Sequence, residues 1–544
     1  MKSALKLISA LGLILTGIPG GSATTAAMES TFTNPVLSGF HADPSICRAG
    51  DDYFLVTSSF EYFPGVPIYQ SKDLVNWKQI GHVLSRPSQL NLDKQYASGG
   101  IFAPTLRHHN GTFYMITTLV GASGGRGGNF YVTATNAAGP WSEPVWLDKQ
   151  GIDPSLFFDA DGKVYYTRQV DGERGYSGQQ LLNLQTGKLE GDIKQLWRGT
   201  GGVWPEGPHL YKINGKYYLM ISEGGTSYDH MLTVARSDSP WGSFEANPKN
   251  PILTHRHLPE HPFQAMGHGD LVETPDGWWV TFLGFRPQGG KFHHLGRETF
   301  LAPVTWEDGW PVVNGGKPIS ATMPAPKLKP HPWPKEPARD NFDSANLRLG
   351  WAFVRNPTEA DYSLSQQPGW LRLHGSAVAL SDLASPTVVG RFQNDFNCRI
   401  STLLSFHPRG TNEEAGLVLR GNDRNHYELG ITLRDGERKA FFRKVLDGKI
   451  VEPVAYATAM DSNTTLTIKA DPLRYEFFYS ASHSQTISLG TALPRDLSTE
   501  TLSAQKGAHF NFTGVFIGLF ATGNGQRSAA PADFDWFEYQ PLDK

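Results

Sequence analysis

Three carboxylates occupy the same position in a hairpin that recurs along the chain. Asp43, Asp153 and Glu206 each lie nine residues before a turn residue, and the same count in two further hairpins gives Phe102 and His268. The turn residues used for this count are Asp52, Gly111, Gly162, Gly215 and Gly277. If the hairpins are equivalent, these side chains meet, and crowded carboxyl groups must raise one another's pKa or become protonated. Clustered acids of this kind usually mark a working site.

Two carboxyl groups facing each other across a scissile bond can hydrolyse a glycoside. One protonates the leaving oxygen while the other activates water or attacks carbon, and a third can keep the acid protonated through its negative charge. An Asp before Pro can instead cap a turn by accepting backbone N–H bonds, which would explain Asp43 or Asp153 singly. Turn capping does not explain why Glu206 shares their position, so the trio favours catalysis.

The hairpins that carry these residues predict an all-β fold. Five segments share one plan: a polar or small residue, a short apolar strand, a Gly, Asp or Asn turn, then an aromatic-rich strand. Such turns between strands are strong hairpin signals. Repeats of about 50 to 60 residues with several short strands each are typical of propeller blades. Residues 31–320 are therefore predicted to form a five-bladed β-propeller, with a β-sandwich as the alternative.

The blade order predicts which carboxyl group does what. Inner strands of a propeller surround its axis, so the five counted residues should share one mouth of the central channel. Asp153 comes from the blade next to that of Glu206, which makes it the natural tuner of that acid. Asp43 comes from a blade two places away from Glu206, and this separation should leave room for a water, as inverting hydrolysis requires.

Composition excludes several functional classes. The chain has 544 residues, with 49 basic and 52 acidic residues and a net charge of -3. It has no basic footprint for nucleic acid and no polybasic membrane patch. Its two cysteines are too few for a disulfide scaffold and lack metal-site spacing. Hydrolysis by paired carboxyl groups requires no cofactor, and the oligomeric state is not determined by these features.

The N-terminus has the order of a secretory signal peptide. Lys2 and Lys6 precede an apolar stretch over residues 7–18, which Pro19 and Gly20 end before a run of small residues. We therefore predict a signal peptide over residues 1–27 and a secreted protein, extracellular or periplasmic. A membrane anchor is the weaker alternative, because the apolar run is shorter than about 18 residues.

The motifs around the three acids resemble those of glycoside hydrolase family 43. The matching segments are residues 39–45, 61–66, 151–155, 204–208 and 294–299, and the likeness covers roughly residues 31–320. The chain is most similar to the β-xylosidase and α-L-arabinofuranosidase branch. This resemblance implies anomeric inversion, with Asp43 as general base, Asp153 as pKa modulator and Glu206 as general acid.

The same resemblance implies a substrate class. It predicts a secreted exo-glycosidase that removes terminal β-1,4-D-xylosyl or α-L-arabinofuranosyl residues from plant cell-wall oligosaccharides of the xylan and arabinoxylan type. One alternative is an endo-arabinanase, which would need a groove open at both ends. A second is a non-catalytic carbohydrate-binding propeller, in which the carboxyl groups only accept hydrogen bonds from hydroxyls.

The resemblance also implies roles for four further residues, and each of them has an alternative role. Arg297 matches an arginine of the sugar pocket, although a surface ion pair with Glu298 would also suit it. Phe60 and Phe102 would wall the pocket against a pentose face, or serve as core aromatics. By the same resemblance His268 would hold a water or a calcium ion on the propeller axis, with contact to a site carboxylate as the alternative. A lone imidazole is a poor calcium ligand set, so water would supply most of the coordination.

A second domain follows a proline-rich connector. Residues 321–339 read as a stiff extended linker. Residues 340–544 alternate apolar and polar positions again and resemble the concanavalin-like β-sandwich of the same xylosidase branch. That domain could bind sugar, or pack on the propeller and wall one side of the pocket; we favour the second role.

Overall fold

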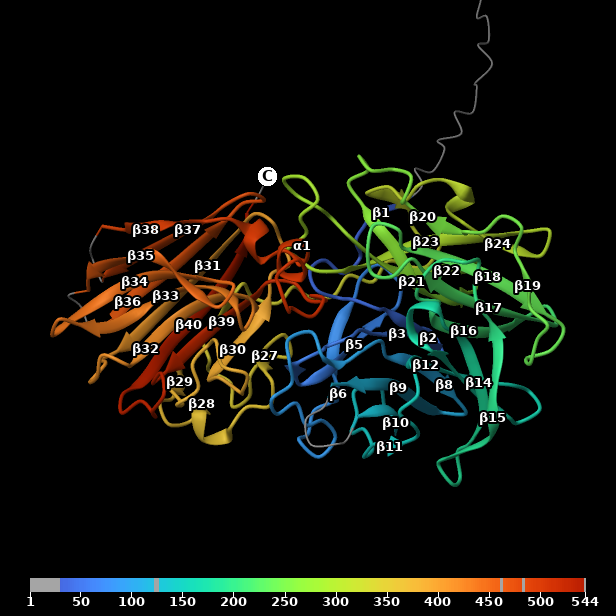
Figure 1. The fold of residues 1–544 in the computed structure, drawn as a ribbon, viewed down its shortest axis with the longest axis horizontal. Helices are drawn as coiled ribbons and strands as arrows, with labels where there is room; N and C mark the ends of the chain where they lie inside the picture. Colours follow the sequence, from blue (N-terminus) through green and yellow to red (C-terminus); the bar gives the residue numbers. More distant parts are fainter. Residues whose placement is uncertain (1–29, 122–126, 460–462, 482–484, 543–544) are drawn as a thin grey trace, which may run out of the picture.

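The computed structural model describes residues 30–121, 127–459, 463–481 and 485–542, and its secondary structure is almost entirely β. A propeller and a sandwich lie side by side (Figure 1), so the predicted fold class is confirmed. The predicted signal peptide, residues 1–27, lies outside the described residues. Within the described ranges no helix is long and apolar enough to span a bilayer. The short helices are α1 (Thr499–Ser503), η1 (Gly172–Arg174), η2 (Asn314–Gly316), η3 (Glu359–Asp361) and η4 (Pro494–Leu497).

Five antiparallel sheets of four or five strands form the blades. In chain order they are β2 (Ser45–Ala49), β3 (Asp52–Val56), β5 (Gly65–Ser71) and β6 (Lys78–Leu84); β7 (Gly100–Ile101), β8 (Thr105–His109), β9 (Thr112–Val120), β10 (Gly128–Ala134) and β11 (Val145–Trp146); β12 (Ile152–Phe158), β13 (Val164–Val170), β14 (Tyr176–Asn183) and β15 (Lys188–Trp197); β16 (Glu206–Ile213), β17 (Lys216–Glu223), β18 (Met231–Ser237), β19 (Glu245–Ala246) and β20 (Leu253–Thr254); β21 (Gln264–Thr274), β22 (Gly277–Phe285), β23 (Glu298–Glu307) and β24 (Trp310–Val313).

The innermost strand of each blade lies at the axis. Strands β2, β8, β12, β16 and β21 contact one another in this order, and β21 contacts β2 again, which closes the ring. Three of the five are irregular just where the counted residues fall, with register shifts inside β12, β16 and β21. Such bulges bend a strand and re-aim its side chains, here at one mouth of the axis.

Two sheets of eight strands form the sandwich. One contains β28 (Tyr362–Ser363), β29 (Leu371–His374), β40 (Pro531–Pro541), β31 (Cys398–Phe406), β36 (Asn463–Ala470), β37 (Tyr475–Ala481), β38 (Ile487–Ala492) and β26 (Arg339–Asp340). The other contains β35 (Lys449–Thr458), β34 (Glu437–Leu446), β33 (Asn425–Arg434), β32 (Glu414–Asn422), β39 (Phe516–Thr522), β30 (Val388–Phe392), β27 (Ala352–Val354) and β4 (Tyr62–Phe63).

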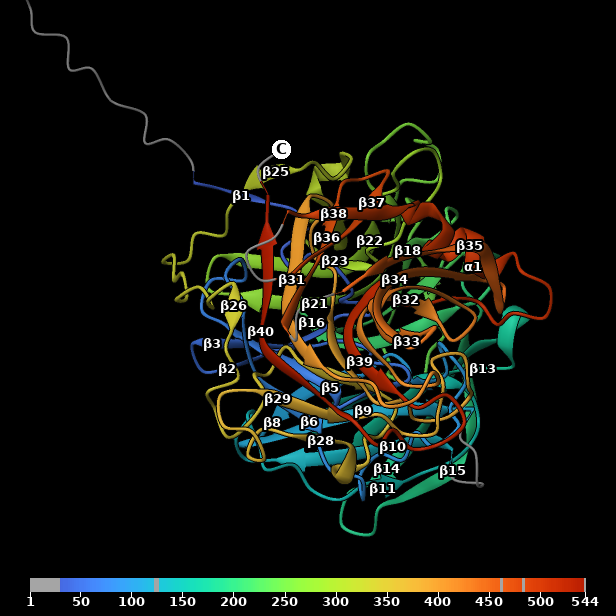
Figure 2. The same ribbon diagram turned by 90° about the vertical axis from the view of Figure 1, so that its left-hand side faces the viewer.

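Alternation along the sandwich strands builds its core. In β37 the side chains of Tyr475, Phe477 and Tyr479 are buried, while those between them are half-buried. Successive side chains of a strand point to opposite faces, so every second residue enters the space between the sheets. The buried side chains of both sheets form the core of the sandwich. Figure 2 shows the sandwich strands in front of the propeller.

The two domains share a sheet. Strand β4 belongs in sequence to the first blade, yet it pairs antiparallel with β27 of the sandwich, with Phe63 opposite Phe353. At the start of the predicted linker, β25 (Thr322–Pro324) returns to pair with β1 (Thr31–Thr33). The sandwich sheet therefore depends on a strand that only the propeller segment supplies.

Candidate active site

All five counted residues line one pocket of about 530 Å³ at the propeller axis. Each comes from a different blade: Asp43, Phe102, Asp153, Glu206 and His268. Asp43, Asp153 and His268 have positive φ angles of 54°, 53° and 46°. This region is uncommon for residues other than glycine, and strained backbone collects at functional sites.

Asp43 is held as a carboxylate by donors on both of its oxygens. Arg297 Nη1 donates to Oδ1 at 2.5 Å, and the Ser58 hydroxyl donates to Oδ2 at 2.6 Å. His268 Nδ1 lies 3.7 Å from Oδ1. Burial raises the pKa of Asp43, but Arg297, His268 and Ser58 together outweigh burial and hold this pKa below its usual value. Asp43 is therefore ionised at neutral pH and can accept a proton.

Glu206 is held in the opposite protonation state. Burial is the largest cause that raises its pKa well above the ordinary value, and the carboxyl groups of Asp153 and Asp43 raise it further. Burial also raises the pKa of Asp153, to about 6. Asp153 accepts the backbone N–H of Gly207 at 3.1 Å, which favours its charged form. The proton of this close pair therefore resides on Glu206.

Arg297 is buried and does not form a surface ion pair with Glu298. Only 3% of its surface is exposed, and its partner is Asp43. Glu298 instead accepts two bonds from Arg286, at 2.6 and 2.7 Å. Arg297 immediately precedes β23, and Glu298 is the first residue of that strand. Successive side chains of an extended chain point to opposite sides, so the ion-pair alternative is wrong.

An aromatic wall from both domains borders the carboxyl groups. Phe60 and Phe102 line the pocket with ring centroids 5.2 Å apart, and Phe512 of the sandwich domain stacks on Phe60 at 5.4 Å with an interplanar angle of 14°. The guanidinium of Arg297 lies 5.5 Å from the Phe60 ring centroid and 5.3 Å from that of Phe512. The backbone N–H of Phe512 donates to the Ser98 hydroxyl at 2.9 Å. The sandwich thus walls the pocket.

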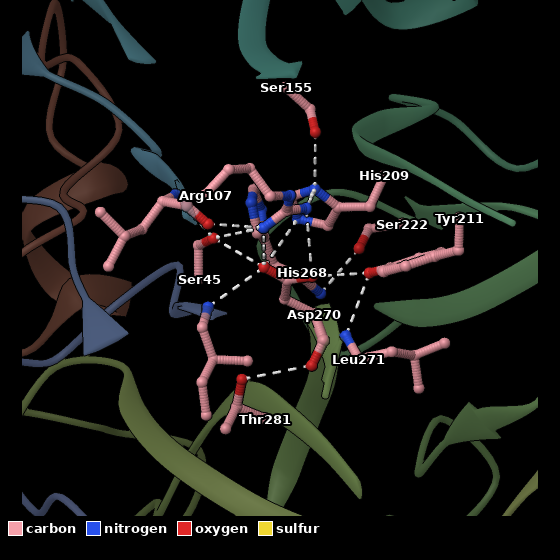
Figure 3. Close-up of polar contacts among 12 residues, drawn as sticks. Ser45, Arg107, Ser155, His209, Tyr211, Ser222, His268, Asp270, Leu271 and Thr281 are labelled. Atoms are coloured by element: carbon pink, nitrogen blue, oxygen red, sulfur yellow. Dashed lines mark hydrogen bonds and ion pairs between the residues drawn. The ribbon is translucent and has the colours of Figure 1, made fainter. Parts of the chain in front are cut away.

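His268 lines the pocket beside the carboxylate of Asp43. Its backbone N–H donates to the Ser222 hydroxyl at 2.7 Å (Figure 3). Over the described ranges, no group of three or more His, Cys, Asp or Glu side chains could hold a metal ion. Calcium takes six to eight oxygen ligands, so water would have to supply most of them beside His268, and calcium on the axis stays a prediction. We therefore derive no step through a metal.

A second ring of polar side chains joins the inner strands to one another (Figure 3). Every inner strand contributes one residue: Ser45, Arg107, Ser155, His209 and Asp270. Asp270 pairs with Arg107 at 2.7 Å and accepts the Ser45 hydroxyl at 2.6 Å. Burial lowers the pKa of His209 to about 3, so its neutral Nδ1 accepts from Arg107 at 2.9 Å. This ring fixes the inner strands just past the carboxyl groups.

Sequence reasoning missed several residues that contact or line the site. Among them are Ser58, Trp204, Asp229, Phe510 and Phe512. Trp204 lies in one of the family-like motifs, but nothing in that motif gave it a role. The two phenylalanines lie more than two hundred residues beyond Arg297, and no spacing links them to the pocket. Only the packing of the sandwich on the propeller brings them there.

Comparison with known protein families defines the class to which this fold and site belong. Residues 32–311 match the family described as Glycosyl hydrolases family 43. Residues 339–540 match the Beta xylosidase C-terminal Concanavalin A-like domain. The chain therefore belongs to glycosyl hydrolase family 43 and is a glycoside hydrolase.

Individual relatives share both domains. The chain is 48% identical over 546 residues to a non-reducing end α-L-arabinofuranosidase of Bacteroides ovatus, and the match covers 100% of each chain. It is 42% identical to a xylosidase/arabinosidase of Butyrivibrio fibrisolvens, covering 94% of this chain and 99% of that one. A solved Bacteroides ovatus structure named Xyloglucan PUL GH43B superposes with a TM-score of 0.90, at 48% identity, over 94% of this chain and 100% of that chain.

Proposed function

We propose that the protein is an exo-acting pentosidase that hydrolyses terminal α-L-arabinofuranosyl and/or β-1,4-D-xylosyl residues of xylan-type and arabinoxylan-type plant cell-wall oligosaccharides. One observation carries the proposal: Asp43, bound by Arg297 and Ser58, and Glu206, whose pKa burial and Asp153 raise, face the same pocket. The names of the Bacteroides and Butyrivibrio relatives support the pentose.

The two carboxyl groups then divide the reaction. Glu206 gives its proton to the glycosidic oxygen as the bond to the anomeric carbon breaks, while Asp43 takes a proton from the attacking water. Arg297 and Ser58 orient Asp43 through its two oxygens. Asp153 keeps the proton on Glu206 until the leaving group requires it. A wall that excludes water strengthens each of these interactions.

Inversion of the anomeric carbon is part of the proposal. Asp43 and Glu206 come from blades two places apart in the ring, which suits a water between the base and the sugar. A nucleophilic Asp43 would instead give retention through a covalent intermediate.

Exo action is supported by the wall that the sandwich adds. Phe510 and Phe512 line the pocket on the side of the second domain, which opposes an endo-arabinanase groove open at both ends. A non-catalytic binding propeller would have no need for two carboxyl groups in opposite protonation states, and the family of the chain argues against it.

A proton NMR time course with the purified full chain tests the proposal. An aryl β-D-xyloside and an aryl α-L-arabinofuranoside are supplied separately, and the first-formed sugar anomer is recorded. Release of α-xylose or β-arabinofuranose supports inversion, and the ratio of the two rates gives the preferred pentose. First-formed sugar of the substrate's own configuration would contradict Asp43 as a base, and no release from either compound would contradict the pentosidase.

We propose in addition that the protein is exported. The apolar stretch with preceding lysines at residues 1–27 supports this. N-terminal sequencing of the protein from its native host should find a mature chain that begins near Thr24 to Met28; an intact Met1 in the secreted or total pool would contradict it.

A further inference from the structure

An exposed tryptophan stands at the edge of the active-site pocket. Of the 14 tryptophans, all within the described residues, Trp204 is the only one with an exposed side chain, at 39%. Phe510, at 40%, is the only exposed phenylalanine among the described residues. Both line the pocket that contains Asp43 and Glu206. Trp204 and Phe510 therefore place two large exposed aromatic surfaces at one pocket.

Trp204 is held in position by the segments on either side. Its backbone N–H donates to the Glu173 carbonyl at 2.8 Å, and the neighbouring Val203 carbonyl accepts the N–H of Gly224 at 2.7 Å. The indole packs against glycine backbone, since a Cβ on Gly225 would lie 3.0 Å from its Cδ1. Trp204 also has a φ of 53°. A bulky residue keeps this conformation only where its surroundings impose it, and such residues are typical of ligand clamps.

The aromatic wall continues from the buried part of the pocket to the same edge. Phe60, at 1% exposure, stacks on Phe512, and the rings of Phe512 and Phe510 lie 4.9 Å apart. Ser227 and Asp229 also line the pocket and add a hydroxyl and a carboxylate. Apolar faces with a few polar groups are the usual composition of a small-molecule site.

We propose that Trp204 and Phe510 form the binding site for the leaving group, and that they recognise a pyranose ring with equatorial hydroxyls, such as the xylose of a xylan backbone. Such a ring presents flat C–H faces, which remove aromatic surface from water, while its hydroxyls point outward to groups such as Asp229. This inference rests on the proposed function, because the leaving group is defined only when a glycosyl residue occupies the carboxylate pocket.

Two substrates with the same glycone separate binding of the leaving group from acid catalysis. Xylobiose offers a pyranose leaving group, whereas methyl β-D-xyloside offers none but still needs a proton from Glu206. If the arabinofuranoside is preferred, arabinofuranosyl-substituted xylobiose and methyl α-L-arabinofuranoside replace them. In Trp204→Ala, kcat/KM for the saccharide divided by kcat/KM for the methyl glycoside should fall about tenfold. The fall should come chiefly from a higher KM for the saccharide. Trp204→Phe should restore most of the ratio.

Tyr456→Ala is the matched control, because Tyr456 is 37% exposed on the sandwich and does not line the pocket. It should leave the ratio at its wild-type value. An equal fall on both substrates in Trp204→Ala would overturn the proposal, because Trp204 would then act by positioning Glu206. An unchanged ratio would overturn it as well.

A binding measurement keeps this inference separate from the proposed function. Isothermal titration of the Asp43→Asn variant with xylobiose and with methyl β-D-xyloside requires no turnover. The saccharide should bind about tenfold tighter, and adding Trp204→Ala should remove most of that difference. Equal affinities in the parent would refute the leaving-group site even if the enzyme hydrolyses pentosides. A clear difference would support it even if hydrolysis is not seen.

Discussion

Asp153 acts on its neighbour through charge. Its carboxylate is one of the groups that raise the pKa of Glu206, and its own oxygen accepts the Gly207 N–H. Glu206 works protonated, so activity is lost as pH rises through its pKa. In Asp153→Asn the amide oxygen can still accept from Gly207 but carries no charge. We expect the basic limb of the kcat/KM profile to move to lower pH by about one unit or more.

Asp161→Asn provides the comparison, because Asp161 lies at the exposed turn of the same hairpin and pairs with Lys163. Its profile should match that of the wild type. A basic limb that stays in place in Asp153→Asn would show that Asp153 does not tune Glu206.

Ser58 makes the complementary prediction for the base. Its hydroxyl donates to Asp43 at 2.6 Å and lowers the pKa of that carboxyl. Asp43 works ionised, so activity is lost as pH falls through its pKa. Ser58→Ala removes the donor, and the acidic limb of kcat/KM should move to higher pH by about one unit.

The neighbouring Ser59→Ala is a control of the same chemistry, because the Ser59 hydroxyl accepts from Val66 and not from the site. An acidic limb equal to that of wild type in Ser58→Ala would mean that Arg297 alone fixes the ionisation of Asp43.

At the scale of elements, Asp270 joins the inner strands of the propeller. It accepts bonds from Ser45, Arg107 and Tyr211, and although burial opposes ionisation, Arg107 and His209 lower its pKa to about 2. Asp270→Asn leaves Arg107 without its charge partner, which costs about 3 kcal/mol or more of the free energy of unfolding at pH 7. Denaturant unfolding measures this loss.

The loss should depend on pH in a defined direction. The folded pKa of Asp270 lies below its unfolded value, so the stabilisation is complete above pH 4 and disappears as pH falls toward about 2. The difference between wild type and Asp270→Asn should shrink over that range. Asp276→Asn, at the exposed turn of β21 and β22, should change little at any pH; a constant gap for Asp270→Asn would contradict the ion pair.

The same elements show what the sequence could predict. Turn residues at a fixed distance from the inner strands placed five side chains at one mouth, because a hairpin is a local structure whose register its turn determines. The bulges that aim Asp153 and Glu206 leave no such signal. Arg297 and Asp43 lie 254 positions apart in the chain. Family resemblance places Arg297 in the sugar pocket but does not predict its bond to Asp43. Phe512 lines the pocket only because the two domains pack against each other, and this packing has no signal in the sequence.

The whole molecule is joined by a buried network of charges between the domains. Glu61 of the propeller accepts from Arg420 of the sandwich at 3.2 Å and from the Ser98 N–H at 2.9 Å. Arg420 and Arg355 both bind Asp423, at 2.8 and 2.7 Å. Ser98 also holds the backbone of the pocket-lining Phe512. The contact that joins the domains therefore also sets the pocket wall.

The domains should consequently unfold together. Strand β4 belongs to the sandwich sheet, and Glu61 immediately before it is fully buried. Separating the domains would remove a strand from one sheet and expose the network. Differential scanning calorimetry of the full chain should show one transition, with a calorimetric enthalpy equal to the van 't Hoff enthalpy. Two resolved transitions in the wild type would contradict this coupling.

Arg420→Met tests the network directly, because it leaves Glu61 buried without its partner. We expect a loss of about 3 kcal/mol or more of the free energy of unfolding at pH 8. Burial already raises the pKa of Glu61, and without Arg420 that pKa rises further. The folded state then holds a proton that the unfolded chain has released, so the loss should be smaller at pH 5 than at pH 8. Arg424→Met removes an exposed ion pair of the same domain and should cost less than about 1 kcal/mol at both pH values. If Arg420→Met costs the same at pH 5 and pH 8, Glu61 is not the group left unpaired, and the interface is stabilised by its apolar contacts instead.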